Sequence, residues 1–352
     1  MKLVIRGALL AAAVSTVSFS HAAPAQAADY FKGKTIKISV GFGPGGGYDA
    51  YGRMLGRHWG RHIAGKPQVI VQNMPGASSL KAVQYLQEVA PKDGTAVVIF
   101  NFGQITNSIV NPSKTIKVDF RNFAWIGSMN RDVSVCYVWK QRFPDIKNAS
   151  DLAKAKRINY GLTGVGSASY FNQAILLGIF DAPLRQVKGY KGSKNKQIAI
   201  ERGELDGDCG DWTSVPKDWE RDGKITYLMK SSPSTPAGLD PSIKYAGDIA
   251  SSAEKKQIVK LLSAAGEVGR PFITRKEVPD GNLKALRAGF DAAMKDPKLL
   301  ADSKKIKRPI SPSTAKEAQE TLAELYAMPA DVIAKTKTIL PKGSKKKKKK
   351  KK

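Results

Sequence analysis

A glycine-rich loop at Gly43–Asp49 carries the residue types that most clearly could do chemistry in this sequence. It follows an apolar strand-like segment and precedes a helix-like spacing of apolar residues. Glycines let the backbone come close to a ligand, and the free N–H groups of a helix start attract an anion. A tight turn that binds nothing is the plainer alternative, but three consecutive glycines exceed what such a turn requires. The loop is therefore predicted to bind an anion.

A second loop of the same kind lies at Gly161–Ser169. Gly164 and Gly166 again separate a strand-like run from a helix-like run, and Ser167 and Ser169 add hydroxyl groups. A third polar turn, 101–106, ends another apolar run. Two anion-binding helix starts, one in each of two lobes, would hold a ligand from both sides, so we expect the ligand in a cleft between them.

The first loop also satisfies a dinucleotide-binding pattern, because Gly41, Gly43 and Gly46 have the spacing G-x-G-x-x-G. In that pattern an acidic residue ends the second strand and binds the ribose. Here the second strand-like run ends at Asn73, and an export signal argues against a nicotinamide cofactor. No lysine follows the glycines, so the phosphate-loop pattern of nucleotide-binding proteins fails as well. No cofactor is predicted.

Catalytic and nucleic-acid-binding signals are weak. His58 and His62 have the i,i+4 spacing of metal ligands, but Trp59 stands where a metalloprotease has glutamate, and no third ligand is evident. No metal site is therefore predicted. G-x-S-x-G is missing from the sequence, which excludes the usual hydrolase nucleophile turn. Basic residues on the same helix lack a nucleic-acid-reading motif. We expect a binding protein without enzymatic activity or a nucleic-acid partner.

The elements that must position these loops alternate between strands and helices. Period-two or continuous apolar runs predict strands, and apolar residues three or four apart predict helices between them. The order implies parallel strands with helical crossovers and two α/β lobes. Strands are expected at 35–40, 68–71, 96–100, 133–139, 157–160, 186–190, 205–211, 224–229 and 270–274, and helices at 49–63, 82–89, 194–202, 283–294 and from 313.

The two ends of the chain have their own patterns. Lys2 and Arg6, an apolar run and the A-x-A pattern Ala25-Gln26-Ala27 predict a cleavable signal peptide at 1–27. Residues 343–352 form a lysine-rich tail that is expected to be disordered. The net charge is +28; the signal peptide supplies two of these charges and the tail eight, which leaves +18 for the rest. The charge would attract anions.

Two cysteines, Cys136 and Cys209, lie in separate strand-like runs. In an oxidising compartment an even number of cysteines permits a disulfide bond. The bond forms only if the two strands are neighbours, because the Cα atoms must lie within about 7 Å of each other. Two buried thiols are the alternative.

An ordered set of motifs resembles the Bug, or TctC-like, family of periplasmic binding proteins that serve tripartite tricarboxylate transporters. The family's first loop, F-x-P-G-G-x-x-D, is similar to Phe42–Asp49, and its V-x-N-x-P-G-A segment is similar to Val71–Ala77. The A-P-x-D-G turn, the Y-K-G motif and the G-x-x-D strand are matched by Ala90–Gly94, Tyr190–Gly192 and Gly203–Asp206. The matches span nearly the whole chain after the signal peptide.

The resemblance implies a two-lobed periplasmic binding protein of type II-like α/β fold, a "Venus flytrap" with mixed, mainly parallel sheets. The chain would cross between lobes near 127–131 and return near 269–271. The first lobe would comprise 28–128 together with 270–342, and the second lobe 129–269. A monomer in the periplasm would capture a small organic carboxylate for the membrane components of a tripartite transporter. The alternative is a co-receptor that reports the ligand to a membrane signalling protein.

The resemblance also implies which residues contact the ligand. In the first lobe they are Gly45, Gly46, Gly47, Tyr48, Asp49, Gln104, Ile105 and Thr106. In the second lobe they are Gly166, Ser167, Ala168, Ser169, Tyr190 and Asp211. Two positions depart from the family pattern: Tyr170 replaces a histidine, and Tyr48 replaces a smaller residue. These changes indicate a ligand that differs from the usual one.

Overall fold

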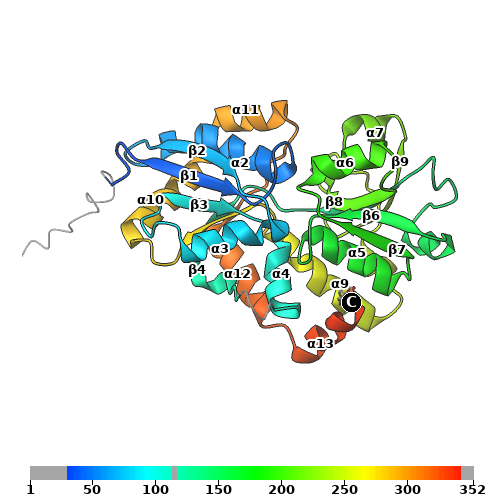
Figure 1. The fold of residues 1–352 in the computed structure, drawn as a ribbon. Coiled ribbons are helices and arrows are strands. Elements are labelled where there is room, and N and C mark those ends of the chain that lie inside the picture. Colours follow the sequence, from blue (N-terminus) through cyan, green and yellow to red (C-terminus); the bar gives the residue numbers. More distant parts are fainter. Residues whose placement is uncertain (1–29, 113–116, 342–352) are drawn as a thin grey trace, which may run out of the picture.

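Two β-sheets organise the chain in a computed structural model that describes residues 30–112 and 117–341 (Figure 1). The first sheet has six strands in the order β11-β4-β10-β3-β1-β2. Its strands are β1 (Thr35–Val40), β2 (Gln68–Asn73), β3 (Ala96–Ile99), β4 (Phe123–Ser128), β10 (Pro271–Arg275) and β11 (Ser313–Thr314). We call this sheet with its helices the first lobe.

Parallel pairing in the first lobe follows the predicted strand–helix alternation. Strand β1 pairs in parallel with both β2 and β3, and helices α2 (Gly47–His58) and α3 (Leu80–Glu88) make the crossovers. The continuous apolar run of β3 is completely buried, as expected for a central parallel strand. Strands β10 and β11 pair antiparallel with their neighbours. The remaining helices are α4 (Gly103–Val110), α10 (Asp280–Ala293), α11 (Pro297–Lys305) and α12 (Ala315–Tyr326).

The second sheet has five strands in the order β7-β6-β8-β5-β9 and forms the second lobe. Its strands are β5 (Ser134–Trp139), β6 (Ile158–Leu162), β7 (Leu184–Lys188), β8 (Gly207–Asp211) and β9 (Ile225–Lys230). Its helices are α5 (Ala168–Ile179), α6 (Ser193–Glu201), α7 (Lys217–Arg221), α8 (Ala246–Ile249) and α9 (Ala253–Ser263). Strand β6 pairs in parallel with β7 and β8, whereas β5 pairs antiparallel with β8 and β9.

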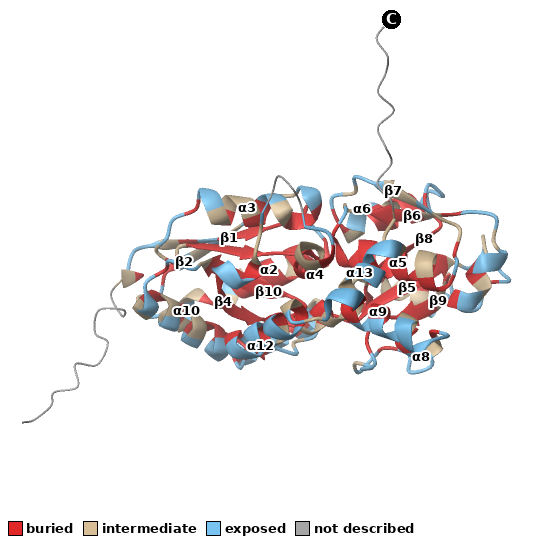
Figure 2. Ribbon diagram, turned by 90° about the horizontal axis from the view of Figure 1, so that it is seen from below, coloured by how far each residue is buried: buried red, intermediate tan, exposed pale blue. Residues whose placement is uncertain are grey.

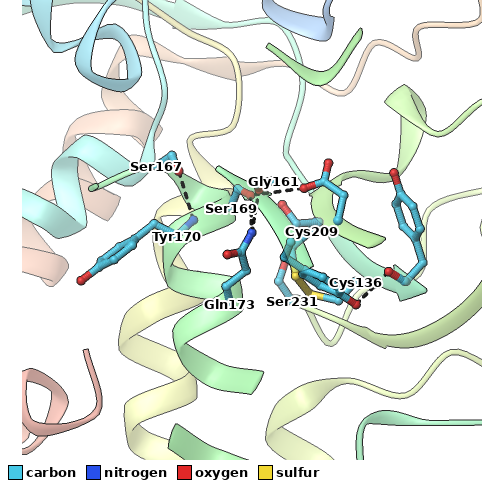
Figure 3. The surroundings of a disulfide bond; sticks show 12 residues. Cys136, Gly161, Ser167, Ser169, Tyr170, Gln173, Cys209 and Ser231 are labelled. Atoms are coloured by element: carbon cyan, nitrogen blue, oxygen red, sulfur yellow. Dashed lines mark hydrogen bonds between the residues drawn. A yellow bond between two sulfur atoms is a disulfide. The ribbon is translucent and has the colours of Figure 1, made fainter. Parts of the chain in front are cut away.

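Antiparallel pairing of β5 with β8 places Cys136 directly opposite Cys209. The structure joins the two residues in a disulfide bond, with their Cα atoms 4.1 Å apart (Figure 3). Both side chains are buried within the second lobe. The bond therefore closes a loop that contains β6, α5, β7 and α6.

The C-terminal helix α13 (Ala330–Ile339) departs from the predicted division of the chain. Its residues fall in the range predicted for the first lobe, but it packs against α5 and α9 of the second lobe as well as α4 (Figure 1). A Cβ atom on Gly178 of α5 would lie 2.5 Å from the Cβ of Ile339, so the glycine permits this close approach. The last helix thus ties the two lobes together.

Buried residues line both sheets and continue from one lobe to the other (Figure 2). One core cluster includes Phe100 and Trp125 of the first lobe together with Tyr160 and Ile175 of the second. None of the helices in the described ranges is both long and apolar enough to cross a membrane. The predicted signal peptide at 1–27 and the lysine-rich tail at 343–352 lie outside the described residues.

Candidate functional site

Three helix starts meet at a small cavity between the lobes, which we call the central cavity. Helix α2 begins there from the first lobe, and helices α5 and α6 begin there from the second. The cavity volume is about 70 Å³. Its lining comprises Phe42, Gly46, Gly47, Tyr48, Asn101, Phe102, Asp132, Ser134, Thr163, Ala168, Ser169, Gly192, Ser193, Lys196, Cys209, Gly210, Asp211, Ser214 and Arg270.

The start of α2 is open to a ligand. Gly46 precedes the helix in an extended conformation with φ of −88°, and no side chain caps the helix. The first amides of a helix have no partner inside the helix, and within the described residues no hydrogen bond takes the Gly47 N–H. Together with the helix dipole, these amides create a local preference for negative charge.

Asp49 stabilises the α2 loop and does not line the central cavity. Its carboxylate accepts hydrogen bonds from the Gly45 N–H at 2.9 Å, from Asn73 Nδ2 at 2.7 Å and from Arg53 Nε at 3.0 Å. Burial raises the pKa of Asp49, but these bonds outweigh burial and hold the pKa below its usual value. The carboxylate therefore fixes the loop conformation without lining the central cavity.

The start of α5 is largely occupied by hydrogen bonds within the protein. Ser167 caps the helix, because its Oγ accepts a hydrogen bond from the Tyr170 N–H at 3.0 Å (Figure 3). The Ala168 N–H donates to Asn101 Oδ1 of the first lobe at 2.9 Å, and the Gly103 N–H donates to the same oxygen at 2.8 Å. An amide oxygen of the first lobe thus occupies the place that a ligand oxygen would take at α5.

A buried charge cluster lies where the chain crosses between the lobes. Arg270 is only 2% exposed, and its Nη2 lies 2.8 Å from Asp132 and also contacts Asp211. The guanidinium carbon lies 4.2 Å from the centre of the Tyr48 ring. Burial raises the pKa of Asp132 to about 7, although Arg270 opposes the shift.

A second buried ion pair flanks the cavity. Lys196 Nζ lies 2.6 Å from Asp208, and Ser169 Oγ lies 3.4 Å from the same nitrogen. Both charged side chains are buried. Around the cavity, two cationic side chains, Lys196 and Arg270, thus face three carboxylates on Asp132, Asp208 and Asp211. These cations and carboxylates largely pair with one another, which leaves the uncapped N–H groups at the start of α2 for an anion.

The structure brings six of the predicted ligand contacts to the central cavity: Gly46, Gly47, Tyr48, Ala168, Ser169 and Asp211. Tyr190 lines a neighbouring cavity between the lobes. The others line neither cavity; these are Gly45, Asp49, Gln104, Ile105, Thr106, Gly166 and Ser167. Gln104, for example, donates hydrogen bonds to the carbonyls of Ala77 and Ser78.

Sequence reasoning missed several lining residues. Asp132 and Arg270 could have been predicted, because each is a charged residue next to an expected lobe crossing. Ser193 begins α6 directly after the Y-K-G motif, where a helix start was also expected. Lys196 and Ser214 carry no such signal, because only the packing of the lobes brings them to the cavity.

The two histidines have structural partners. His58 Nε2 lies 2.9 Å from Asp302, and His62 Nε2 lies 2.9 Å from Asp296. Both contacts join the end of α2 to the α11 region. In the described parts of the chain, no group of three or more metal-ligating residues gathers at one place.

No family model matches the sequence. Among the curated proteins, a UPF0065 protein of Bordetella pertussis is 26% identical over 200 residues, which is 55% of this chain and 59% of that protein. A UPF0065 protein from Pseudomonas sp. strain P51 is 26% identical over 185 residues. This chain therefore spans little more than half the length of the curated relatives that it matches.

Solved structures cover nearly the whole fold. The periplasmic binding protein BugD matches 87% of this chain and 97% of its own, with a TM-score of 0.69 and 18% identity. Rpa4515 of R. palustris with adipate matches 88% of this chain and 98% of its own, with a TM-score of 0.67 and 18% identity. MatC of Rhodopseudomonas palustris with bound malate matches 85% of this chain and 99% of its own, with a TM-score of 0.66 and 16% identity.

These neighbours share the two-lobed α/β architecture predicted for this chain, and BugD is described as a periplasmic binding protein. The predicted fold class is therefore confirmed. The predicted resemblance is confirmed as well: the chain is similar to the Bug, or TctC-like, solute-binding proteins in both its sequence motifs and its fold.

Proposed function

We propose that this protein captures a small organic carboxylate in the central cavity and delivers it to a secondary transporter of the tripartite tricarboxylate type. The observation that carries the proposal is the uncapped start of α2, which faces a cavity lined from both lobes. Adipate and malate in two structures of the same fold support a carboxylate as the ligand. No chemical step is involved.

The amides of Gly47 and Tyr48 would bind one carboxylate oxygen, since a helix start offers paired N–H donors. Two more donors are available: Tyr48 Oη and Arg270 Nε are buried and have no hydrogen-bond partner among the described residues. An unpaired buried donor costs free energy, so a ligand oxygen that accepts from it is bound more tightly. Hydroxyl groups of Ser169 and Ser193 complete the polar lining from the second lobe.

The contacts between the lobes suit closure around a ligand. The Gly43 N–H donates to the Lys191 carbonyl at 2.9 Å, and Ser78 Oγ lies 3.1 Å from Thr163 Oγ1. At the lobe crossing, Gly269 has φ of +53°, and a Cβ there would lie 1.9 Å from the Asn130 carbonyl oxygen. A glycine is thus required where the two crossing segments touch, which is a suitable place for a hinge.

Export to the periplasm and pairing with membrane components are parts of the same proposal. Support for export comes from the signal-peptide pattern at 1–27 and from the disulfide bond, which persists in oxidising compartments. We further propose that the protein acts as a monomer, with the lobes divided near 128 and 270.

Calorimetric titration of the purified chain with succinate, malate, adipate and benzoate at pH 7.5 tests the carboxylate. We expect at least one acid to bind, and its uncharged amide to bind at least 100-fold more weakly, because helix-start amides favour a negative charge. Binding of neutral sugars in place of every acid would contradict the proposal. Deletion of an adjacent membrane-protein gene, followed by uptake of the bound acid, tests the transporter role.

A further inference from the structure

The central cavity is too small to hold a ligand of the size that solute-binding proteins enclose. Its volume is about 70 Å³. Binding sites for small molecules usually measure about 300–1,000 Å³. In this arrangement of the lobes, a carboxylate group fits in the central cavity but most of the ligand needs another place.

A second cavity of about 230 Å³ lies directly beside the first, also between the lobes. Phe42 and Thr163 line both cavities. These two residues therefore lie where the two cavities meet, and Thr163 is held there by a hydroxyl–hydroxyl contact of 3.1 Å to Ser78. The two volumes add to about 300 Å³, which reaches the range of ordinary ligand sites.

The first-lobe wall of the second cavity has a strained backbone. Ala77, Ser78 and Ser79 follow one another with φ of 44°, 54° and 77°, in the left-handed region that residues with side chains rarely adopt. Each such residue costs on the order of 1–3 kcal/mol, and strain of this kind concentrates at functional sites. Surrounding contacts hold the segment in place: Ser79 Oγ accepts from the Asn101 N–H at 2.9 Å, and Gln104 donates to two of its carbonyls.

The lining of the second cavity differs chemically from that of the central cavity. It contains no carboxylate side chain, whereas Asp132 and Asp211 line the central cavity. The second lobe contributes the half-buried ring of Tyr190 and the exposed cation Lys191, and the first lobe contributes Pro75. This lining suits an aliphatic or aromatic body and tolerates a second anionic group at its far end.

We propose that the two cavities form one elongated site, in which the α2 start binds a carboxylate and the second cavity holds the body of the same ligand. The ligand is then a carboxylic acid longer or bulkier than a four-carbon diacid: a medium-chain dicarboxylate or an aromatic acid. This assignment rests on the proposed function, since it takes a carboxylate at α2 as given. It explains why Tyr190 lies between the lobes yet outside the central cavity.

Calorimetric titration with a length series tests the assignment: succinate, adipate and suberate, with phenylacetate as an aromatic acid. Suberate or phenylacetate should bind at least tenfold more tightly than succinate. Tyr190→Ala should lower the affinity for the longer acids at least fivefold, whereas its affinity for succinate should stay within twofold of the wild-type value. Tight binding of succinate that declines with length would overturn the elongated site but leave the proposed function standing. Failure of every acid would instead overturn the proposed function.

A charge reversal gives a matched control. Lys191→Glu should lower the affinity for suberate at least fivefold more than the affinity for phenylacetate, because only suberate brings a second carboxylate to the far end of the site. Lys194→Glu places the same change on an exposed lysine that does not line the second cavity, and should affect both ligands equally. If both variants weaken the binding of both ligands equally, the far end of the ligand does not lie in the second cavity.

Discussion

Helix α2 in the first lobe and helix α5 in the second both begin after a glycine-rich loop that follows a strand, but their first turns differ. At α2 the preceding residue is Gly46, which offers no side-chain cap. At α5 Ser167 caps the helix, and Asn101 from the opposite lobe takes the Ala168 N–H. Similar sequence patterns therefore produce one helix start that is free for a ligand and one that is used by the protein.

The lobes differ in a second way. The second lobe carries the disulfide bond between β5 and β8, and the first lobe has no cysteine among its residues. The lobe that provides the open helix start thus depends on packing alone, whereas the lobe with the capped start is also covalently constrained.

Removal of the disulfide should have the largest effect on stability. Cys136 and Cys209 are 73 residues apart, and closure of a loop of that length stabilises a fold by about 4 kcal/mol, chiefly by constraining the unfolded chain. The double variant Cys136→Ala, Cys209→Ala should lose about that free energy of unfolding in urea. Hydrogen exchange should locate the loss in β5 and β8, with β1 and β3 less affected. Equal loss of protection in both lobes would show that they unfold as one unit.

Gly47→Val should abolish binding at the open helix start, with a loss of at least 100-fold in affinity. The added Cβ would lie 2.8 Å from Ser214 Oγ and 3.5 Å from Arg270 Nη2, so the side chain pushes the second lobe away and covers the amides. Calorimetry with the ligand of the wild-type protein measures the loss, and circular dichroism checks the fold.

Gly46→Ala is the matched control for that variant. Gly46 has a negative φ, and a Cβ there would meet only Ser193 Oγ at 3.3 Å, which can rotate away. Affinity should fall less than tenfold. If Gly47→Val binds as tightly as the wild-type protein, the ligand does not bind at the start of α2.

Much of this architecture could be predicted from the sequence, because strand and helix periods are local properties. The apolar run at 96–100 and the alternation at 35–40 correspond to β3 and β1 within one residue. Helix α2 begins at Gly47, two residues before the predicted Asp49, since a glycine in an extended conformation can precede a helix without a capping side chain. The helix predicted from 313 begins at Ala315, with Thr314 as its cap.

The site could be predicted only in part. The loops were visible because glycine spacing is local, but the partner of each amide depends on how the lobes meet. Asn101 lies 67 residues before Ala168, and no sequence pattern relates them. The placement of α13 against α5 and α9 has the same origin, because it depends on contacts between residues far apart in the sequence.

Asn101→Ala should convert the capped start of α5 into a more open one. Two buried N–H groups, those of Gly103 and Ala168, would lose their acceptor, at a cost of about 1–3 kcal/mol each. Without ligand the lobes should then separate more often, and small-angle X-ray scattering should give a larger radius of gyration that returns to the wild-type value with ligand. Asn101→Asp keeps an acceptor oxygen and should stay compact. An unchanged radius for Asn101→Ala would mean that Asn101 does not hold the lobes together.

The smallest expected effect concerns pH, and it separates the backbone donors of α2 from the charged side chains beside them. Burial raises the pKa of Asp132 to about 7, whereas in the unfolded chain an aspartate titrates near 3.9. The folded protein therefore holds an extra proton between about pH 4 and pH 7, and the stability that this proton contributes is lost as pH rises through that window. Arg270 and Asp211 are the charged groups that face Asp132, and Ser134 donates a hydrogen bond to it.

A bound carboxylate favours the neutral form of Asp132, because a nearby negative charge disfavours a second one. Affinity should therefore increase as pH falls from 8 to 6, by up to about tenfold for a shift of one pKa unit. Phenylacetate has one carboxyl group, which stays ionised over this range, so with this acid the ligand does not contribute to the change. Asp132→Asn keeps the shape of the side chain without its charge and should give an affinity that is high and independent of pH. If the affinity of the variant depends on pH in the same way, another group takes up the proton. The amides at the start of α2 would then bind the carboxylate without a contribution from the buried charge cluster.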